Sequence, residues 1–298
     1  MPNLSEVFND KQYLAQNNYK LQHYRHRDEK IEVEEHFHDF YEIFFLFSSE
    51  FVEYSIDGRT FKLQANDILI INSETVHRAV SLGHNYDRLM LWIIPSYLKR
   101  ISTPTTNLCR CFENIEATRN KNLLRLNPIC AVKIRNIFLK IEAAYASDSY
   151  GGDLLMCSYL TELLVCINRY CRNPHNEIDE SDITSNPLVD AALKYINENI
   201  SEDLGLDTIS KNLFVSKYHL LREFKKCIGY TVHQYILIKR LLLAENLLAE
   251  GKSTITEICF NCGFVSYTNF IRAFKKHYGI SPGKFSKNIP SAATMFNR

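Results

Sequence analysis

Hydrophobic positions in the last hundred residues recur with helical spacing, and the pattern occurs twice. Leu220 and Phe224 are four residues apart, and Phe270 and Phe274 repeat that spacing fifty residues later. Such self-similarity marks one structural unit used twice. At the same offset, the identical pairs are Phe214 and Phe264, Val215 and Val265, Ser216 and Ser266, Arg222 and Arg272, Phe224 and Phe274, Lys225 and Lys275, Lys226 and Lys276, and Gly229 and Gly279. Each copy predicts a short helix, a turn, and a second helix with an apolar back and a basic front.

Capping residues place the starts of these helices. Ser216 and Ser266 suit the N-cap of the second helix in each copy, where a hydroxyl accepts a bond from a backbone N–H. Between the copies, Thr231 with Gln234 forms a capping box before an apolar segment, residues 236–248, that predicts a buried helix. A rigid helix between the copies would fix their separation.

A helix with an arginine on its front suits the major groove of DNA. A guanidinium can bond guanine O6 and N7 together, and lysines can take phosphates. Two such helices about 34 Å apart would contact successive major grooves on one face of the duplex. The candidate DNA-binding residues are Ser216, Lys217, Tyr218, Leu221, Arg222, Lys225, Ser266, Tyr267, Thr268, Ile271, Arg272 and Lys275.

The segment from about Leu188 to Phe285 resembles the DNA-binding domain of the AraC/XylS family of transcription regulators. The resemblance rests on I-x-E-I-C-x-x-C-G-F, on F-K-K-x-x-G-x-S-P, and on the earlier F-K-K-x-x-G. The chain departs from the family pattern at Gly205, Ser210, Cys259 and Ser286. These are small residues at capping or packing positions, so we expect lower stability there and an unchanged fold.

The pattern over residues 31–95 is that of β-strands. Val52, Tyr54 and Ile56 alternate with polar residues, and Asp57-Gly58 is a favourable hairpin turn. Several short strands with regular turns predict a small barrel or jelly roll.

A cluster of ionisable residues falls within this β region. His36, His38 and Glu42 follow the spacing His-x-His-x3-Glu, and His77 lies thirty-five residues beyond Glu42. Alternation predicts that the first three share one face of a strand. Three imidazoles and a carboxylate can bind a transition metal; they can equally line a polar pocket that hydrogen-bonds a ligand. Glu42 could also be a buried carboxylate paired with an arginine, Arg78 or Arg88.

The same region, quoted as HFHDFYEI and NDILIINSETVHR, resembles the cupin-like sensor half of many AraC-type proteins. That resemblance implies an effector-binding domain, usually free of metal, so we expect no cofactor. The expected effector-binding residues are His36, His38, Glu42, His77 and Trp92, although Trp92 could simply fill the core. Asn66 and Ser48-Ser49 stand where glycine is usual, which weakens the expected turns.

Two further helices follow the strands, with apolar spacing of three and four over residues 130–145 and 155–170. The second carries more apolar residues than one stripe requires. Burial within the chain and a dimer interface are equally compatible with this excess. Residues 172–187 are polar and acidic and predict a linker, which gives a cupin-like domain at 1–171 and a DNA-binding domain at 188–298.

Composition changes the picture in two respects. The net charge of +1 divides unevenly: residues 186–289 hold 14 Lys and Arg and 9 Asp and Glu, whereas residues 1–185 hold 20 and 25. The positive half therefore carries the repeat, as phosphate binding requires. Nine cysteines without framework spacing, and a start that lacks the pattern of a signal peptide, predict a cytoplasmic protein. No apolar run reaches the roughly 18 residues of a membrane helix.

We therefore expect an α+β multidomain fold, with an N-terminal cupin-like β-barrel and helical hairpin and a C-terminal all-α domain. The family resemblance implies a non-enzymatic regulator whose partners are double-stranded DNA, a small molecule such as a sugar, RNA polymerase and a second copy of the chain. Two alternatives remain open at this point. One is a metal-dependent cupin enzyme fused to a DNA-binding domain, and the other is a regulator whose sensor domain binds nothing.

Overall fold

The computed structural model describes residues 17–26, 35–48, 52–73, 75–81, 86–113, 122–171 and 178–288. The chain divides into two compact units, Met1–Ser185 and Asn186–Arg298. Among the described helices, none is long and apolar enough to cross a membrane.

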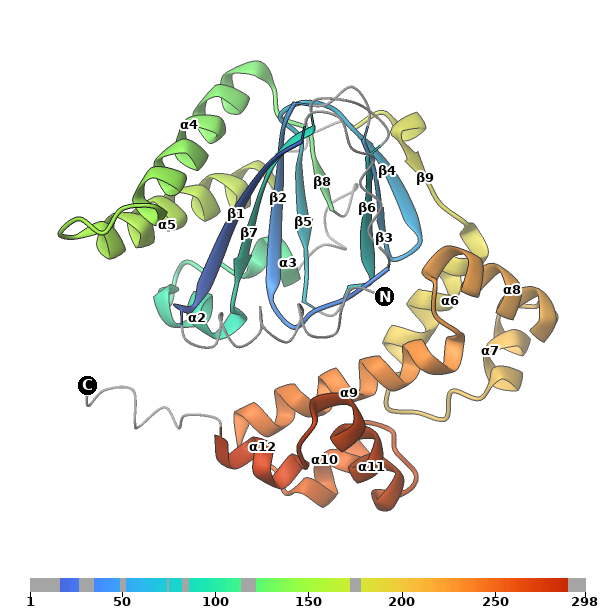
Figure 1. Ribbon diagram of the computed structural model, residues 1–298. Coiled ribbons are helices and arrows are strands. Elements are labelled where there is room, and N and C mark those ends of the chain that lie inside the picture. The colour runs from blue at the N-terminus through green and yellow to red at the C-terminus, as the bar shows by residue number, and fades with distance from the viewer. Residues whose placement is uncertain are drawn as a thin grey trace. The chain divides into compact units, whose positions relative to one another are not determined.

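The first unit contains two antiparallel sheets (Figure 1). The five-stranded sheet has the order β1 (Tyr19–His26), β7 (Tyr86–Ile93), β2 (Tyr41–Ser48), β5 (Ile68–Ile71) and β8 (Leu123–Leu124). The four-stranded sheet has the order β6 (His77–Ser81), β3 (Val52–Ile56), β4 (Arg59–Leu63) and β9 (Ile183–Thr184). The strands described do not close into one barrel, so the barrel expected from the sequence appears here as two separate sheets.

Strand β2 is buried on both faces, which explains its nearly continuous apolar run. Phe45 and Phe47 belong to the core beneath the helices, whereas Phe44 and Leu46 belong to the core between the two sheets. Glu42 shares the parity of Phe44 and Leu46, so alternation places it on the face toward the other sheet.

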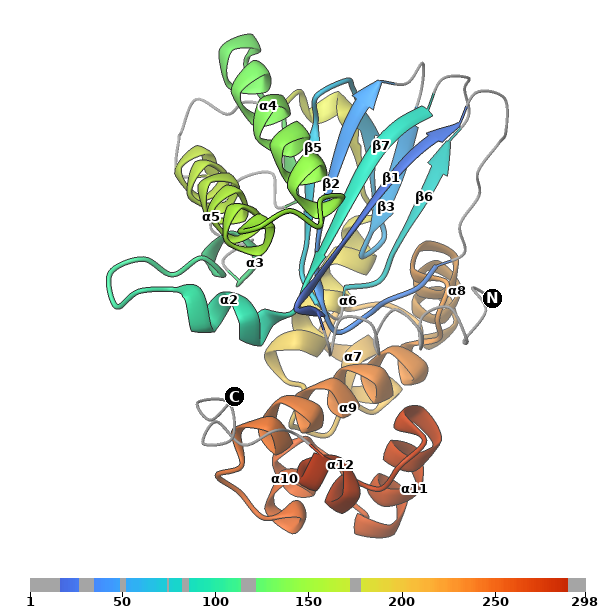
Figure 2. The same ribbon diagram turned by 60° about the vertical axis from the view of Figure 1, so that its left-hand side comes forward.

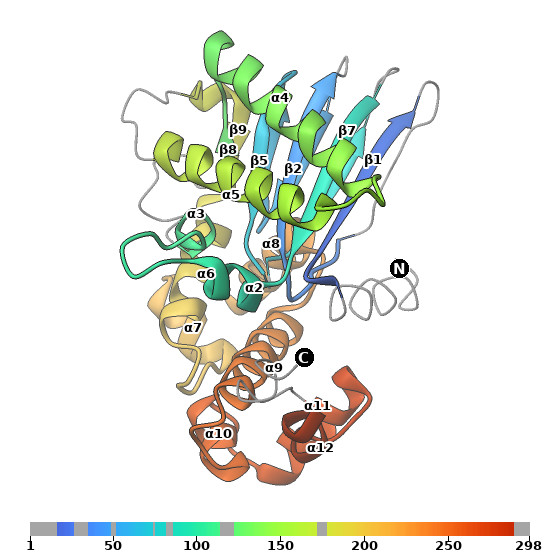
Figure 3. The ribbon, with the colours of Figure 1, turned by 90° about the vertical axis from the view of Figure 1, so that its left-hand side faces the viewer.

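Helices cover the outer face of the five-stranded sheet, as Figure 3 shows for α4 and α5. Phe138 of α4 stacks on Phe45 at 4.6 Å between ring centroids, and Met156 and Leu160 of α5 complete this core. The helices of this unit are α2 (Pro95–Ile101), α3 (Arg110–Glu113), α4 (Pro128–Tyr145) and α5 (Gly152–Cys171). The predicted helical pair is thereby confirmed.

The residues with positive φ in the turns of this unit are of types that tolerate the left-handed region. Asp57 and Gly58 have φ of 45° and 74° and join β3 to β4, as the hairpin signal predicted. Asn66 has φ of 72°, and asparagine tolerates this left-handed region better than most residues. Asparagine therefore replaces the expected glycine without loss of the turn.

Part of the predicted linker belongs to the first unit. A 3₁₀ turn, Glu180–Asp182, leads into β9, which pairs with β4. Arg125 binds both Asp182 and the buried Asp67, the latter at 2.9 Å between Nη2 and Oδ2. The linker prediction is therefore wrong for residues 183–184, and residues 172–177 lie outside the described part.

The second unit is helical throughout its described residues. Its central helix, α9, contacts α8 on one side and α10 and α12 on the other (Figures 1 and 2). The helices are α6 (Pro187–Glu198), α7 (Leu206–Asn212), α8 (Lys217–Ile228), α9 (Val232–Glu250), α10 (Ile255–Asn261), α11 (Tyr267–Tyr278) and α12 (Pro282–Asn288). The predicted capping box at Thr231 is present, and Thr254 forms a second capping box with Glu257.

Candidate functional site

Two helix-turn-helix motifs, α7–α8 and α10–α11, present their second helices in the same way. Ser216 and Ser266 accept from the backbone N–H of His219 and Asn269, each at 3.3 Å, which confirms both N-caps. The apolar backs of the two helices are fully buried, and they consist of Leu220, Phe224, Phe270 and Phe274. The periodicity thus fixes which side of each helix faces away from the core.

The candidate DNA-binding residues lie where the periodicity places them. Those on the exposed face are Ser216, Lys217, Tyr218, Arg222, Lys225, Tyr267, Thr268, Arg272 and Lys275. Ser266, Leu221 and Ile271 are half-buried. Only part of the Leu221 and Ile271 side chains is therefore accessible to solvent.

The exposed side chains of the two motifs have different local partners. Arg222 forms an ion pair with Glu223, with 3.1 Å between Nε and Oε1. Arg272 instead donates from Nη2 to the neutral Oδ1 of Asn269 at 2.6 Å. Lys217 pairs with Asp207 at 2.5 Å. In the first motif, therefore, two exposed cations are paired with carboxylates, whereas Arg272 of the second motif bonds a neutral amide.

The turns also differ, and here the repeat at an offset of fifty is misleading. The N–H of Phe214 bonds the carbonyl of Lys211, and the N–H of Gly263, forty-nine residues on, bonds that of Phe260. Phe214 therefore corresponds to Gly263, not to Phe264 as the sequence predicted. Four residues separate α7 from α8 but five separate α10 from α11. The second turn thus contains one extra residue before its capping serine.

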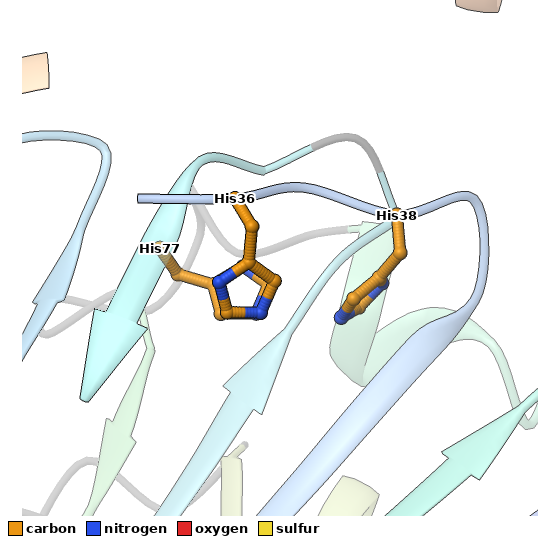
Figure 4. Close-up of side chains that lie close together, drawn as sticks. All are labelled: His36, His38 and His77. Carbon is orange, nitrogen blue, oxygen red and sulfur yellow. The ribbon is translucent and has the colours of Figure 1, made fainter. Parts of the chain in front are cut away.

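The second candidate site is the histidine cluster, His36, His38 and His77. Figure 4 shows the three rings on the same side of the backbone, with His77 at the start of β6 and the other two from the segment before β2. One nitrogen from each ring lies within 4.8 Å of the others. His36 and His77 exchange both backbone hydrogen bonds, at 3.0 and 2.9 Å. The expectation that His36 and His38 share a strand with Glu42 is wrong, because β2 begins at Tyr41; the residues nevertheless meet.

Glu42 lies beside this cluster and is held by three side chains. Its Oε2 is 3.2 Å from His38 Nε2 and accepts from Trp92 Nε1 at 2.7 Å. Its Oε1 accepts from the hydroxyl of Tyr54 at 3.3 Å. Trp92 also packs against Phe40, which agrees with the core interpretation, while its assignment to effector binding stays a prediction. The alternative pairing with Arg78 does not occur, since Arg78 binds Glu35 at 3.3 Å.

Burial sets the charge states around Glu42. Desolvation and the neighbouring His38 lower the pKa of His36 to about 4, and desolvation also lowers the pKa of His77 well below its usual value. Burial alone would raise the pKa of Glu42, but the hydrogen bond from His38 and the nearby imidazoles outweigh it and lower that pKa to about 2. A carboxylate anion therefore faces imidazoles, of which His36 and His77 are neutral at pH 7.

Two polar residues on the same interior face lie outside the predicted effector-binding set, although the sequence offered Arg88 as a possible partner of Glu42. Arg88 is 6% exposed, lies over the Tyr86 ring, and has no hydrogen-bond partner for Nε or Nη1 within the described residues. Tyr54 closes the far side of Glu42. The inward parity of Tyr54 between Val52 and Ile56 was visible in the sequence, whereas that of Arg88 depends on the pairing of β7 with β2.

Cys259 and Cys262 are fully buried, and Cys259 lies on α10. Burial, with the neighbouring Cys259, raises the pKa of Cys262 to about 12. A protonated thiol is a poor metal ligand. The sequence interpretation of Cys259 as a small packing residue agrees with this environment, and Cys262 is buried in the same core.

Comparison with known proteins places this geometry in context. Residues 209–288 match the sequence model of a family described as "Helix-turn-helix domain". The chain is 37% identical over 103 residues to the probable transcription factor PqrA of Proteus vulgaris, covering 34% of this chain and 84% of PqrA. It is 24% identical over 239 residues to the lactose operon transcription activator of Staphylococcus xylosus, covering 78% of each.

Other relatives match over a smaller part of their length. The chain is 31% identical over 138 residues to the Msm operon regulatory protein of Streptococcus mutans, covering 46% of this chain and 49% of that protein. The chain therefore spans about half of the length of this relative. The family match at residues 209–288 covers the end of α7 and all of α8, α10 and α11, which carry the sequence motifs quoted above. With its double motif and its identity to most of PqrA, the chain belongs to the AraC/XylS family of transcription regulators.

Proposed function

We propose that this protein is a sequence-specific DNA-binding regulator of transcription whose first unit binds a small molecule. The observation that carries the DNA-binding part is the pair of capped helices, α8 and α11, with arginines at equivalent exposed positions. Each helix carries its cations on the side opposite a fully buried apolar stripe, so one rigid face is available for the major groove.

Charge distribution supports this assignment. Residues 186–289, with 14 Lys and Arg and 9 Asp and Glu, form the positive half of the chain. Phosphate neutralisation by these residues would release counterions, so we expect affinity to fall steeply with salt.

Sequencing the DNA that the full chain retains from random fragments tests the proposal. We expect an enriched motif with two half-sites about 10–10.5 base pairs apart, one per helix-turn-helix motif. A variant with both Arg222 and Arg272 replaced by alanine is the control, and it should retain no motif. Recovery of random sequence by the unaltered chain would contradict specific binding.

The polar groups between the two sheets support an effector rich in oxygen atoms. Two nitrogen atoms of Arg88, Nε and Nη1, lack a hydrogen-bond partner within the described residues, and so does the hydroxyl of Tyr86. Buried donors of this kind cost free energy until they are bonded. A sugar or related carbohydrate supplies such acceptors, and the name of the Staphylococcus xylosus relative points to the same class.

A thermal-shift screen of the full chain against sugars and sugar phosphates tests the effector class. We expect at least one to raise the melting temperature, and the Arg88→Met variant to lose that response while it still folds. An apolar replacement of a buried, unpaired charge is often tolerated. A stabilising sugar that acts equally on the variant would remove Arg88 from the site.

Dimerisation through α4 and α5 completes the proposal. Large apolar side chains are exposed along these two helices, among them Ile129, Val132, Leu139, Leu154 and Leu155. Apolar patches of this kind mark interaction sites. We expect the protein to sediment as a dimer and Leu155→Glu to shift it toward monomer; an unchanged monomeric mass in both would contradict this part.

A further inference from the structure

Arg88 is a buried cation on the face of the five-stranded sheet that is directed toward the other sheet. It lies directly opposite Leu46 of β2 and Tyr24 of β1. Directly opposite residues of an antiparallel pair share a face, and Leu46 belongs to the core between the two sheets. Because Arg88 is only 6% exposed, its guanidinium is largely removed from water.

Within the described residues this cation has no carboxylate partner, and its Nε and Nη1 have no acceptor. Asp87, its neighbour in sequence, instead bonds Nε2 of His23 at 2.6 Å. Alternation along β7 places Asp87 on the opposite face of the sheet. Glu42 shares the face of Arg88, but it pairs with Trp92, four residues or about 13 Å along β7 from Arg88. Its carboxylate accepts from the indole N–H of Trp92 at 2.7 Å.

Two tyrosine rings lie beside the Arg88 guanidinium. Its Cζ is 4.9 Å from the ring centroid of Tyr24 and 4.5 Å from that of Tyr86. An aromatic face attracts a cation, so these rings can hold the side chain in place before anything binds. They add no acceptor for Nε or Nη1, which both stay unbonded in the part of the chain that the structure describes. The donors are therefore positioned for an acceptor from outside the protein.

We propose that Arg88 binds an oxyanion of the effector, a carboxylate or a phosphate, so that the effector is an acid. A sugar hydroxyl can accept from one N–H, but it leaves the buried charge without a counter-charge. Carboxylate and phosphate supply both the charge and several acceptor atoms, and their geometry matches the guanidinium fork. The inference rests on the proposed function in taking the first unit as the sensor. It narrows the proposed carbohydrate to acidic derivatives, such as a sugar acid or a sugar phosphate.

The burial of Arg88 would make this recognition selective. A neutral ligand leaves a buried charge unpaired, which costs more than the loss of an ordinary hydrogen bond. Salt screens a buried pair much less than an exposed one. We therefore expect an acid to bind at least about 100-fold more tightly than its neutral counterpart, at low and at physiological salt.

The test compares acids with neutral molecules of the same carbon skeleton. Glucose and galactose are the neutral probes, and their uronates and 6-phosphates are the acids. Hexanoate serves as an acid without a sugar ring. The full chain is titrated with each probe up to about 10 mM, and binding is measured by the shift in melting temperature. Fluorescence of Trp92, the only tryptophan, gives a second measurement. The comparison of uronates with 6-phosphates distinguishes a carboxylate from a phosphate.

Variants make the assignment specific. Arg88→Met removes the charge at similar length and should reduce the preference for acids to less than about 10-fold. Arg88→Lys keeps the charge without the fork, so it should keep the preference with weaker affinity. Arg25→Met is the matched control, because it removes the same charge from an arginine of β1 that lies on the Asp87 side, with its side chain 67% exposed. It should leave the preference unchanged, and retained DNA binding by each variant shows that it folds.

Two results would overturn the inference: no acid among these probes binds at about 10 mM, or an acid keeps its full advantage in Arg88→Met. If a neutral sugar binds through Arg88 while the acids do not, the carbohydrate proposal stands and the inference fails. If hexanoate binds through Arg88 and no sugar derivative does, the acid site stands and the carbohydrate proposal fails. Retention of DNA by the full chain is measured separately, so neither result affects the DNA-binding proposal.

Discussion

The turns of the two helix-turn-helix motifs share one left-handed position, which is occupied by opposite residue types. Gly263 has φ of 79°, and at the corresponding position Phe214 has φ of 56°. A Cβ atom at Gly263 would lie 2.8 Å from the carbonyl oxygen of Ile200 and 2.9 Å from Cζ of Arg240. Phe214, by contrast, is 95% exposed. The left-handed conformation is common to both turns, but only the second is closely packed.

The close packing around Gly263 marks a contact between the two motifs. Arg240 of α9 donates to the carbonyls of Ile200 and Glu202 at 3.0 and 2.6 Å, and Ser201 donates to the carbonyl of Asn261 at 2.6 Å. The loop before the first motif is thereby held against the turn of the second. Glycine is required at Gly263 by this contact as well as by its φ, and the contact contributes to fixing the distance between the two motifs.

The largest expected effect comes from filling this contact. Gly263→Ala should destabilise the second unit by about 2–4 kcal/mol, because it combines left-handed strain of about 1–2 kcal/mol with a clash against backbone. Gly251→Ala is the matched control: its φ is 65° but nothing lies within 4 Å of the added Cβ. That variant should lose only about 1 kcal/mol. Urea unfolding of residues 186–298, followed by helical circular dichroism, measures both; equal losses would show that packing at the junction contributes nothing.

The arginines give the next largest effect. Arg222→Ala and Arg272→Ala should each cost about 1–3 kcal/mol on a selected DNA site and far less on random DNA. Competition binding with the two DNAs measures this. Equal losses of affinity on both DNAs would show that the arginine contacts phosphate and not bases.

A second pair of substitutions separates the two motifs. Glu223→Gln removes the anion that holds Arg222 and should tighten DNA binding, whereas Asn269→Ala removes only a neutral acceptor from Arg272. We expect a measurable gain in affinity for the first variant and little change for the second. A gain of the same size in both would show that the ion pair does not restrain Arg222.

The helical unit was largely predictable because its signals are local. Capping boxes, N-cap serines and apolar stripes lie within a few residues of the features they determine. The extra residue in the second turn was not predictable, because Phe-Val-Ser recurs at an offset of fifty and makes the two turns look equal in length. Only the backbone bonds of Gly263 and Phe264 show the shift to forty-nine.

The β unit was less predictable because its pairings are non-local. Strand β1, Tyr19–His26, pairs with β7 at the edge of its sheet and carries too few apolar residues to signal a strand. The spacing of His36, His38 and Glu42 did identify the cluster. The hydrogen bonds of Nδ1 in His38 and His77 could not be inferred, because they depend on backbone carbonyls that the fold brings to these rings.

The first helices of the two motifs, α7 and α10, differ in their N-caps. We expect changes at these caps to alter stability less than the substitutions at Gly263 do. Thr254 accepts from the N–H of Glu257 at 3.2 Å, whereas Gly205 caps α7 with no side-chain bond. Thr254→Ala should cost about 1 kcal/mol, and Gly205→Ser should gain a few tenths of a kcal/mol. The same urea unfolding measures both. A loss of stability on adding the serine would indicate that the loop before α7 needs the freedom of glycine.

The smallest expected effect comes from removing the backbone strain at Phe214 in the first turn. Phe214→Gly removes left-handed strain of about 1 kcal/mol but adds chain entropy to the unfolded state that costs about 0.5 kcal/mol or more. The expected result is therefore a gain of up to about 0.5 kcal/mol. Phe214→Ala keeps the Cβ atom and the strain, and since the ring is exposed it should leave stability unchanged. If alanine proves as destabilising as a core truncation, then the Phe214 ring packs against something in solution, and the contrast between an open first turn and a closed second turn fails.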